Sequence, residues 1–170
     1  DGQNYIGKVT WQAADAHRIV AKWTGAPADI DGTNSSQFTA PEASSTQFQD
    51  SSIWQAELNS VLSDALLLNA QVGFFENTID VDPTGGNYDL PGHQQQATDI
   101  LEQNYYYVSL NDRFRDEYRL NMSLFVDDFA GAHELKAGAE YSDMQFDIVS
   151  FYTGGGFFYD MEFPLADDVD

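Results

Sequence analysis

One alternation of apolar and polar residues runs through residues 118–126 and is repeated, after a turn, in residues 134–141. The apolar positions are Tyr118, Leu120, Met122, Leu124 and Val126 in the first arm and Leu135, Ala137, Ala139 and Tyr141 in the second. A period of two predicts extended strands with one apolar and one polar face. The charged side chains of both arms fall on the polar face. This pattern is typical of a sheet with lipid on one side and water on the other, and a soluble sandwich can produce it as well.

The chain has 170 residues, no cysteine and a net charge of −21. This length is enough for one domain with a core. The lack of cysteine excludes disulfides and thiolate metal sites, and so acidic a chain lacks the basic patch that nucleic-acid binding requires. No apolar run is long enough for a membrane-spanning helix. Because the sequence opens with Asp1 rather than Met, we expect it to be a portion of a larger protein.

The charged residues are sorted along the chain. None of the seven basic residues lies between Trp23 and Asp112 or after Lys136. Acidic residues are numerous in both of these stretches, so the long connections are expected to carry the acids. The sorting predicts that the two ends of the strands face different surroundings.

Six strand-like segments are arranged as three hairpins, with short turns and long polar connections. We expect strands near residues 5–13, 18–25, 54–62, 66–76, 105–126 and 134–150, and external loops at 26–52, 77–104 and 151–170. Short turns alternating with long loops are typical of outer-membrane barrels. The sequence therefore predicts an all-β fold, an antiparallel up-and-down transmembrane β-barrel segment. Since closure needs about eight strands, these six would be part of a larger barrel.

The segment 105–126 is interpreted as one strand, because a turn at Arg115-Asp116 would break the alternation of short and long connections. At about 3.3 Å per residue this strand would be roughly 70 Å long. Crossing a bilayer takes only about 9–11 residues, so half of the strand would project beyond it. Aromatic residues lie at or near the ends of the apolar faces, as interfacial girdles require, although a soluble core could also hold them. They are Trp11, Trp23, Trp54, Phe74, Tyr118 and Tyr141.

Two stretches resemble the barrel of Oar-like TonB-dependent receptors. Residues 5–12, followed by His17-Arg18-Ile19, resemble strands of that family, and residues 125–141 resemble its turn motif G-[SA]-H-x-[LF]-K-x-G. The motif here reads Gly131-Ala132-His133-Glu134-Leu135-Lys136-Ala137-Gly138. The resemblance covers most of the strand-like portion and none of the long loops.

The resemblance implies a plugged barrel of about twenty-two strands in the bacterial outer membrane, with its loops facing the exterior. It further implies uptake of a nutrient with energy from the TonB complex. The implied partners are outer-membrane lipid, a plug domain, TonB, an unidentified nutrient and a surface lipoprotein or other subunit on the loops. The plug, the TonB-contacting segment and an aromatic-terminated last strand have no counterpart in this sequence.

Four basic residues are candidates for ligand binding on the face that would line the lumen, namely Lys8, Lys22, Arg119 and Lys136. Carboxylates on the same face could instead pair with them in cross-strand ladders. No enzyme activity is expected, because the histidines at positions 17, 93 and 133 are scattered and form no catalytic or zinc-binding spacing.

Asp80 and Asp82 are candidate metal ligands. The stretch from Asp80 to Gly85 resembles the start of a calcium loop, but its twelfth position is Pro91 instead of a bidentate Glu. We expect no resident cofactor, although clustered external acids could hold Ca²⁺ loosely. A solvated acidic loop is the alternative.

A second function stays open at this point. A secreted, acidic, soluble β-protein, such as an adhesin or a surface-layer domain, would share the composition and the alternation. The two functions differ in what should cover the apolar face: hydrocarbon in one case and a second layer of protein in the other.

Overall fold

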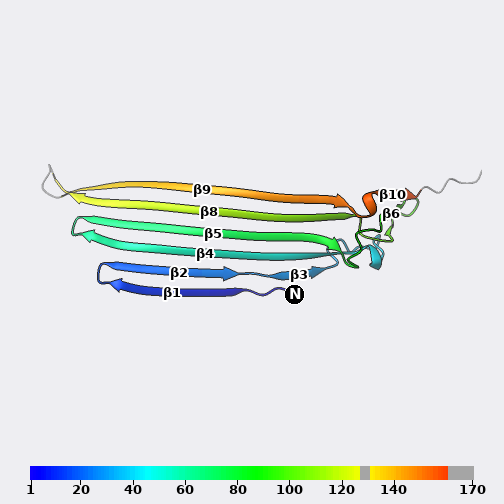
Figure 1. Ribbon diagram of the computed structural model, residues 1–170, viewed down its shortest axis with the longest axis horizontal. Coiled ribbons are helices and arrows are strands. Elements are labelled where there is room, and N and C mark those ends of the chain that lie inside the picture. Colours follow the sequence, from blue (N-terminus) through cyan, green and yellow to red (C-terminus); the bar gives the residue numbers. More distant parts are fainter. Residues whose placement is uncertain (127–130, 161–170) are drawn as a thin grey trace, which may run out of the picture.

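A computed structural model describes residues 1–126 and 131–160 of the chain (Figure 1). The strands are β1 (Tyr5–Ala14), β2 (His17–Gly25), β3 (Ala28–Asp31), β4 (Ser45–Ser63), β5 (Leu66–Pro83), β6 (Gly92–Gln95), β7 (Leu101–Glu102), β8 (Tyr107–Val126), β9 (His133–Tyr152) and β10 (Phe157–Asp160). Two single turns of 3-10 helix are η1 (Pro41–Ala43) and η2 (Thr153–Gly155). Within the described ranges, no helix has the length and apolar character needed to cross a membrane.

The long strands form one antiparallel, up-and-down sheet in the order β1-β2-β4-β5-β8-β9. β3 continues the line of β2 along the first part of β4. The turns that join β1 to β2 and β4 to β5 lie at one end of the sheet, as do the end of β8 and the start of β9, and the long connections lie at the other end (Figure 1). The predicted all-β, antiparallel fold is confirmed. The sheet is open, with β1 and β9 as its edges.

The strands extend further than the sequence predicted. β4 begins at Ser45 rather than near residue 54, and β5 ends at Pro83 rather than near 76. The expected loop 26–52 therefore contains β3 and the start of β4, and the expected loop 77–104 contains the end of β5, β6 and β7. The expected loop 151–170 includes η2 and β10, and its residues 161–170 lie outside the described ranges.

The loop prediction for the start of β4 was wrong because residues 45–52 carry mostly polar side chains on both faces. Such a stretch reads as a loop by composition, yet a ladder needs only backbone partners. The end of β5 was missed although Ile79 and Val81 alternate there with polar residues. Gln49, for example, pairs with Ile79, and Thr78 pairs with Asp112, in registers that continue without interruption from the apolar half of each strand. Strands can carry polar side chains on both faces wherever both faces meet water.

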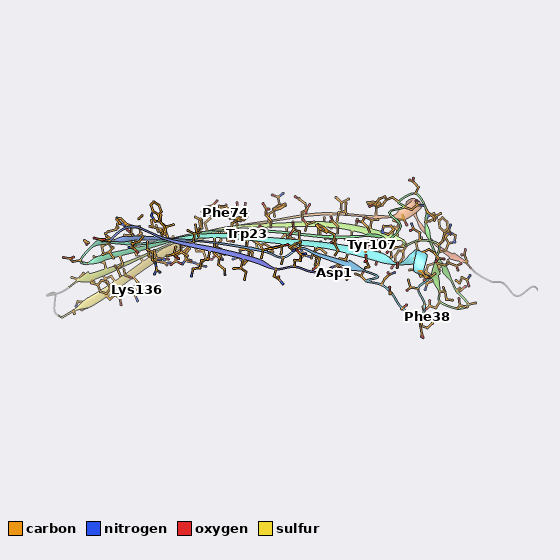
Figure 2. All side chains as sticks on the ribbon, turned by 90° about the horizontal axis from the view of Figure 1, so that it is seen from below. Asp1, Trp23, Phe38, Phe74, Tyr107 and Lys136 are labelled. Atoms are coloured by element: carbon orange, nitrogen blue, oxygen red, sulfur yellow. The ribbon has the colours of Figure 1, made fainter. Side chains whose placement is uncertain are left out.

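The sheet is a single layer with side chains projecting from both surfaces (Figure 2). In the described part of the chain, Ala43 and Val108 are the only buried hydrophobic residues. Large apolar side chains such as Trp54 (56% exposed) and Leu135 (59% exposed) stay uncovered. The whole chain has 42% hydrophobic residues, and a sheet with almost no core in its described part must find its apolar contacts outside itself.

The long connections form a compact assembly, which we call the loop cap (residues 32–44, 84–106 and 153–160). It contains the small sheet β10-β6-β7, in which β10 runs parallel to β6. Backbone bonds join its three parts: the Leu101 amide donates to Phe38 at 2.8 Å, and the Gly154 amide donates to Tyr88 at 2.8 Å. The buried Asn104 side chain donates to the carbonyl oxygens of Asn87 (2.8 Å) and Leu90 (2.5 Å). These bonds hold together segments that are far apart in the sequence.

Candidate functional site: two charge-sorted faces and a basic groove

The ladder registers assign each strand residue to one of two faces, because side chains alternate along a strand. The row Lys8–Lys22–Gln55–Gly73–Glu117 runs across five strands, and we call its side the basic face. The opposite side carries the row that includes Trp23, Trp54 and Phe74, and we call it the apolar–acidic face.

Charge is sorted between these faces as well as along the chain. All seven basic residues lie on the basic face: Lys8, Arg18, Lys22, Arg113, Arg115, Arg119 and Lys136. The strand acids on the same face are Glu57, Glu117, Glu134 and Glu140. The strand acids on the apolar–acidic face are Asp29, Asp31, Asp50, Glu76, Asp80, Asp82, Asp112, Asp116, Asp143 and Asp147. Many acids therefore lie on extended strands, and not in the loops where the sequence placed them.

An apolar band occupies the half of the apolar–acidic face nearest the turns. It spans nine residues on each of four strands: 5–13 on β1, 66–74 on β5, 118–126 on β8 and 133–141 on β9. Beyond the band, towards the loop cap, this face carries only acids among its charged residues. The band thus has the same length on these four strands, whereas on β2 it covers only Ile19 to Trp23, because His17 faces Ser60 at its turn end.

A row of aromatic side chains marks the limit of the band on the side of the loop cap. Ring centroids are 6.3 Å apart for Tyr5 and Trp23, 5.8 Å for Trp23 and Trp54, and 6.1 Å for Phe74 and Tyr118. Tyr141 extends the row to β9, at 6.3 Å from Tyr118. Trp11 lies apart from the row, two residues before the Ala13 end of the band on β1.

The turns are displaced in one direction from one hairpin to the next. The Val61 amide donates to Ala16 in the first turn at 2.8 Å, and the second turn lies further along, at Ala65. The Phe125 amide donates in turn to Ala65 at 2.8 Å. The aromatic row is displaced in the same direction only between the second and third hairpins, where Tyr118 pairs with Val72 instead of Phe74. Between the first and second hairpins it is not displaced, because Trp23 and Trp54 are directly opposite each other.

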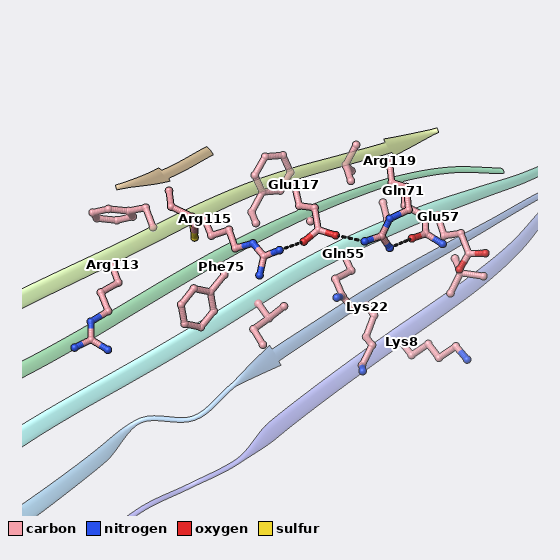
Figure 3. A pocket seen from close by; sticks show the side chains of 18 of the residues that line it. Lys8, Lys22, Gln55, Glu57, Gln71, Phe75, Arg113, Arg115, Glu117 and Arg119 are labelled. Carbon is pink, nitrogen blue, oxygen red and sulfur yellow. Dashed lines mark hydrogen bonds and ion pairs between the residues drawn. The ribbon is translucent and has the colours of Figure 1, made fainter. Parts of the chain in front are cut away.

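The basic face contains an open groove of about 700 Å³ (Figure 3). Its lining includes Lys8, Lys22, Ile53, Gln55, Glu57, Gln71, Gly73, Phe75, Arg113, Arg115, Glu117, Arg119, Met144 and Phe146. Gly73 lies in the row that joins Lys22 and Gln55 to Glu117 and leaves that position without a side chain. The groove combines cationic groups with an apolar wall, which neither the alternation nor the composition indicated.

A network of ion pairs neutralises part of this charge. Glu117 lies between Arg115 and Arg119, with N···O distances of 2.7 and 2.6 Å. Arg119 also donates to Glu140 at 3.2 Å and to Gln71 at 3.1 Å. Glu57 accepts from two asparagine side chains, at 2.7 and 2.9 Å. The carboxylates of the groove are thus already engaged.

Lys8, Lys22 and Arg113 are not part of this network, so their positive charges are not neutralised by it. Lys8 and Lys22 are directly opposite each other on β1 and β2. Neither they nor Arg113 has an ion pair or a hydrogen bond with a side chain in residues 1–126 and 131–160. Like charges directly opposite in a ladder are destabilising. The basic face has seven bases against four acids, so an excess of three positive charges is left on it.

The structure brings together three of the four predicted ligand-binding residues. Lys8, Lys22 and Arg119 line the groove, whereas Lys136 lies near the third turn and pairs with Glu134 at 3.2 Å. Gly73 and Phe75 were missed as site residues. The predicted hairpins could have placed them, since continuing the registers from the turns puts both on the face of Lys8.

Asp80 and Asp82 lie on β5, in the acidic part of the apolar–acidic face and away from the groove. Burial raises the pKa of Asp80, and the nearby Asp112 and Asp82 add to the increase, while a backbone hydrogen bond from Asn111 opposes it. The Tyr88 hydroxyl donates to Asp82 at 3.0 Å. Across the described ranges, no three His, Asp or Glu side chains converge as metal ligands. Loose calcium binding by these acids stays a prediction.

Comparisons of the chain with protein-family models, with curated proteins and with solved structures find no match.

Proposed function

We propose that this chain forms part of the wall of a transmembrane β-barrel in a bacterial outer membrane. The observation that carries the proposal is the apolar band, nine residues long on β1, β5, β8 and β9 and limited by the turns on one side and by the aromatic row on the other. Nine residues at about 3.3 Å each, tilted by about 40°, span about 23 Å along the membrane normal. Outer-membrane barrels present an apolar band of about 25 Å with aromatic girdles.

The open edges support a larger barrel. The outer sides of β1 and β9 pair with no strand of the described sheet, and β9 is 20 residues long. Hydrocarbon offers no hydrogen-bond partner for an open edge, so a membrane-embedded sheet must close on itself. In this proposal further strands complete the barrel, the basic face lines its interior and the apolar band meets lipid.

We propose further that the barrel belongs to a TonB-dependent receptor that imports a nutrient. The strands β4, β5, β8 and β9 continue about nine to eleven residues beyond the aromatic row, so they project well past the membrane. Such projecting strands with a large loop cap suit a big plugged transporter, because the cap offers an external surface for binding. The resemblance of Gly131–Gly138 to the turn motif of Oar-like receptors points in the same direction.

The test uses the full-length polypeptide that carries these residues. A barrel predicts extraction from membranes only with detergent, together with gel mobility that changes when the unheated sample is boiled. A receptor predicts in addition a plug domain in the same polypeptide and cross-linking to TonB in energised cells. If the protein needs detergent and shows heat-dependent gel mobility but has no plug domain and no cross-link to TonB, the receptor proposal fails and the barrel proposal stands.

The acidic part of the apolar–acidic face favours a competing function. A secreted acidic β-protein, such as an adhesin or a surface-layer domain, would also keep ten strand acids on one solvated surface. That protein would fold in aqueous buffer, with its apolar band covered by another layer of protein. Folding of the full-length polypeptide without detergent would therefore replace the membrane proposal with this one.

A further inference from the structure

We propose that the basic groove binds an anionic small molecule with an apolar body, and that Lys8 and Lys22 bind its anionic group. The inference deepens the proposed receptor function and rests on it, because it assigns the chemical class of the ligand that the barrel interior would accept. It is carried by charges that the protein leaves uncompensated beside an apolar wall.

The two lysines are the first part of the argument. Lys8 faces Lys22 across the β1–β2 ladder, and Gln55 follows in the same row. A directly opposed like-charge pair costs stability, and neither ammonium group has a partner within the described residues. The nearby Glu117 and Glu140 are bound by Arg115 and Arg119. An anion from outside would remove this repulsion by bridging the two ammonium groups.

The apolar wall is the second part. Ile53 and Phe75 are directly opposite each other, in the row next to the one that holds Lys22, and they line the groove. Met144 and Phe146 of β9 line it as well. A mostly apolar site with a few charged groups that fix orientation is the usual design for small ligands, with volumes of about 300–1,000 Å³. The groove, at about 700 Å³, falls in this range.

Gly73 is the third part, because it keeps the middle of the groove empty. A Cβ atom at this position would meet its nearest neighbours, the Trp54 carbonyl oxygen and the side chains of Gln55 and Glu117, at 3.9–4.0 Å. These are ordinary contacts, so neither backbone strain nor crowding requires glycine here. Glycine weakens a strand interior and often marks a site where a ligand approaches the backbone. We infer that the ligand occupies the space above Gly73.

The experiment measures binding of naphthalene-1,5-disulfonate, a water-soluble aromatic anion, to the purified full-length protein in neutral detergent by fluorescence titration. The neutral 2-naphthyl glucoside is the matched probe. We expect saturable binding of the disulfonate at least about tenfold tighter than that of the glucoside, since hydrogen bonds to charged groups are worth about tenfold or more each. Raising the salt concentration should weaken the disulfonate alone.

Three variants localise the site. Lys8→Gln/Lys22→Gln should lose at least about tenfold in affinity for the disulfonate, and Gly73→Val should lose affinity by filling the groove. Arg18→Gln should leave the affinity unchanged, because Arg18 is a basic residue of the same face that lies outside the groove.

Equal effects of the lysine and Arg18 variants, or no saturable disulfonate binding, would overturn the proposal. Saturable binding of an acidic peptide together with no binding of the disulfonate would also overturn it, because this result would show that the groove holds polypeptide. Heat-dependent gel mobility, measured on the same samples, reports the barrel separately. A folded barrel that fails to bind the anion contradicts this inference alone.

Discussion

Trp23 of β2 and Trp54 of β4 face each other across the ladder, with ring centroids 5.8 Å apart and ring planes inclined by 40°. On the turn side of this pair the same face carries alanine, leucine and isoleucine. On the loop side it carries acids, beginning with Glu76, which is directly opposite Ser52. The Trp23 indole donates towards that polar side, to Ser52 at 3.3 Å. The pair therefore marks a change of surroundings, as tryptophan does at a membrane interface.

Substitution of Leu120 by arginine tests which medium covers the apolar band. Leu120 lies within the band on β8, two residues from its aromatic end at Tyr118, between Ala70 and Ala139, and is 43% exposed in the isolated sheet. If hydrocarbon covers it, Leu120→Arg should destabilise the folded full-length protein by about 1–3 kcal/mol, between the costs at the bilayer midplane and at the interface. The measurement is the temperature or urea concentration at which heat-modifiable gel mobility is lost in lipid vesicles.

Asn121→Arg is the matched control, because Asn121 is the next residue of β8 and points to the basic face. We expect a change of less than about 0.5 kcal/mol for an exposed polar site. Equal effects of the two variants would mean that both faces meet the same medium, and the membrane proposal would fail.

Glu117→Gln tests the ion-pair network of the groove. The substitution removes the carboxylate that Arg115 and Arg119 share and leaves two further cations on a face that already has an excess. We expect a loss of about 0.5–1 kcal/mol in unfolding free energy, since exposed pairs contribute about 0.2–1 kcal/mol each. The loss should shrink in 0.5 M salt, measured by urea titration at two salt concentrations. Glu134→Gln breaks only the exposed pair with Lys136 and should have no measurable effect.

The sequence predicted the sheet well because period-two alternation needs no knowledge of the rest of the fold. Leu120 and Leu135 were assigned to one face by parity alone, and the register places them there. The start of β4 was not predicted, because its pairing depends on neighbouring strands and not on a local pattern. The end of β5 does alternate, since Ile79 and Val81 lie between Thr78, Asp80 and Asp82, and this pattern could have placed Asp80 on a strand opposite Leu110.

The groove could be predicted only in part, for a related reason. The basic character of its face follows from the alternation, which identified Lys8, Lys22 and Arg119. The neutralisation of Arg119, and the lack of a partner for the two lysines, depend on distances between strands. The loop cap was not predictable at all: its bonds, such as the one between Leu101 and Phe38, join segments without any repeated pattern.

Asp80→Asn tests the acidic part of the apolar–acidic face, which lies beyond the apolar band. Burial and the nearby Asp112 and Asp82 raise the pKa of Asp80. The folded protein therefore binds this proton more tightly than the unfolded chain, so the ionised carboxyl opposes folding at neutral pH. This cost disappears as the pH falls through the raised pKa towards the ordinary value of 3.8.

We expect Asp80→Asn to stabilise the protein by a few tenths of a kcal/mol at pH 7, with the gain vanishing near pH 4. The measurement is the difference in thermal unfolding temperature between the variant and the wild type at each pH. Because every other carboxyl titrates in both proteins, the difference isolates Asp80. If the stabilisation by Asp80→Asn instead increased as the pH is lowered, it would contradict a raised pKa of Asp80.

Asn104→Ala tests whether the loop cap folds as one unit. The Asn104 amide is 2% exposed and donates to two carbonyl oxygens, those of Asn87 and Leu90. Its removal leaves both acceptors buried without this donor, at a cost of about 1–3 kcal/mol. Because the long strands have their own ladders, we expect the loss to be local. Brief protease digestion should cut the cap faster in the variant, while the heat-dependent gel mobility expected of the proposed barrel stays unchanged. Asn4→Ala, an exposed site outside the strands, is the control and should be cut at the wild-type rate. Loss of the heat-dependent mobility together with cap protection would show instead that the cap and the sheet fold together.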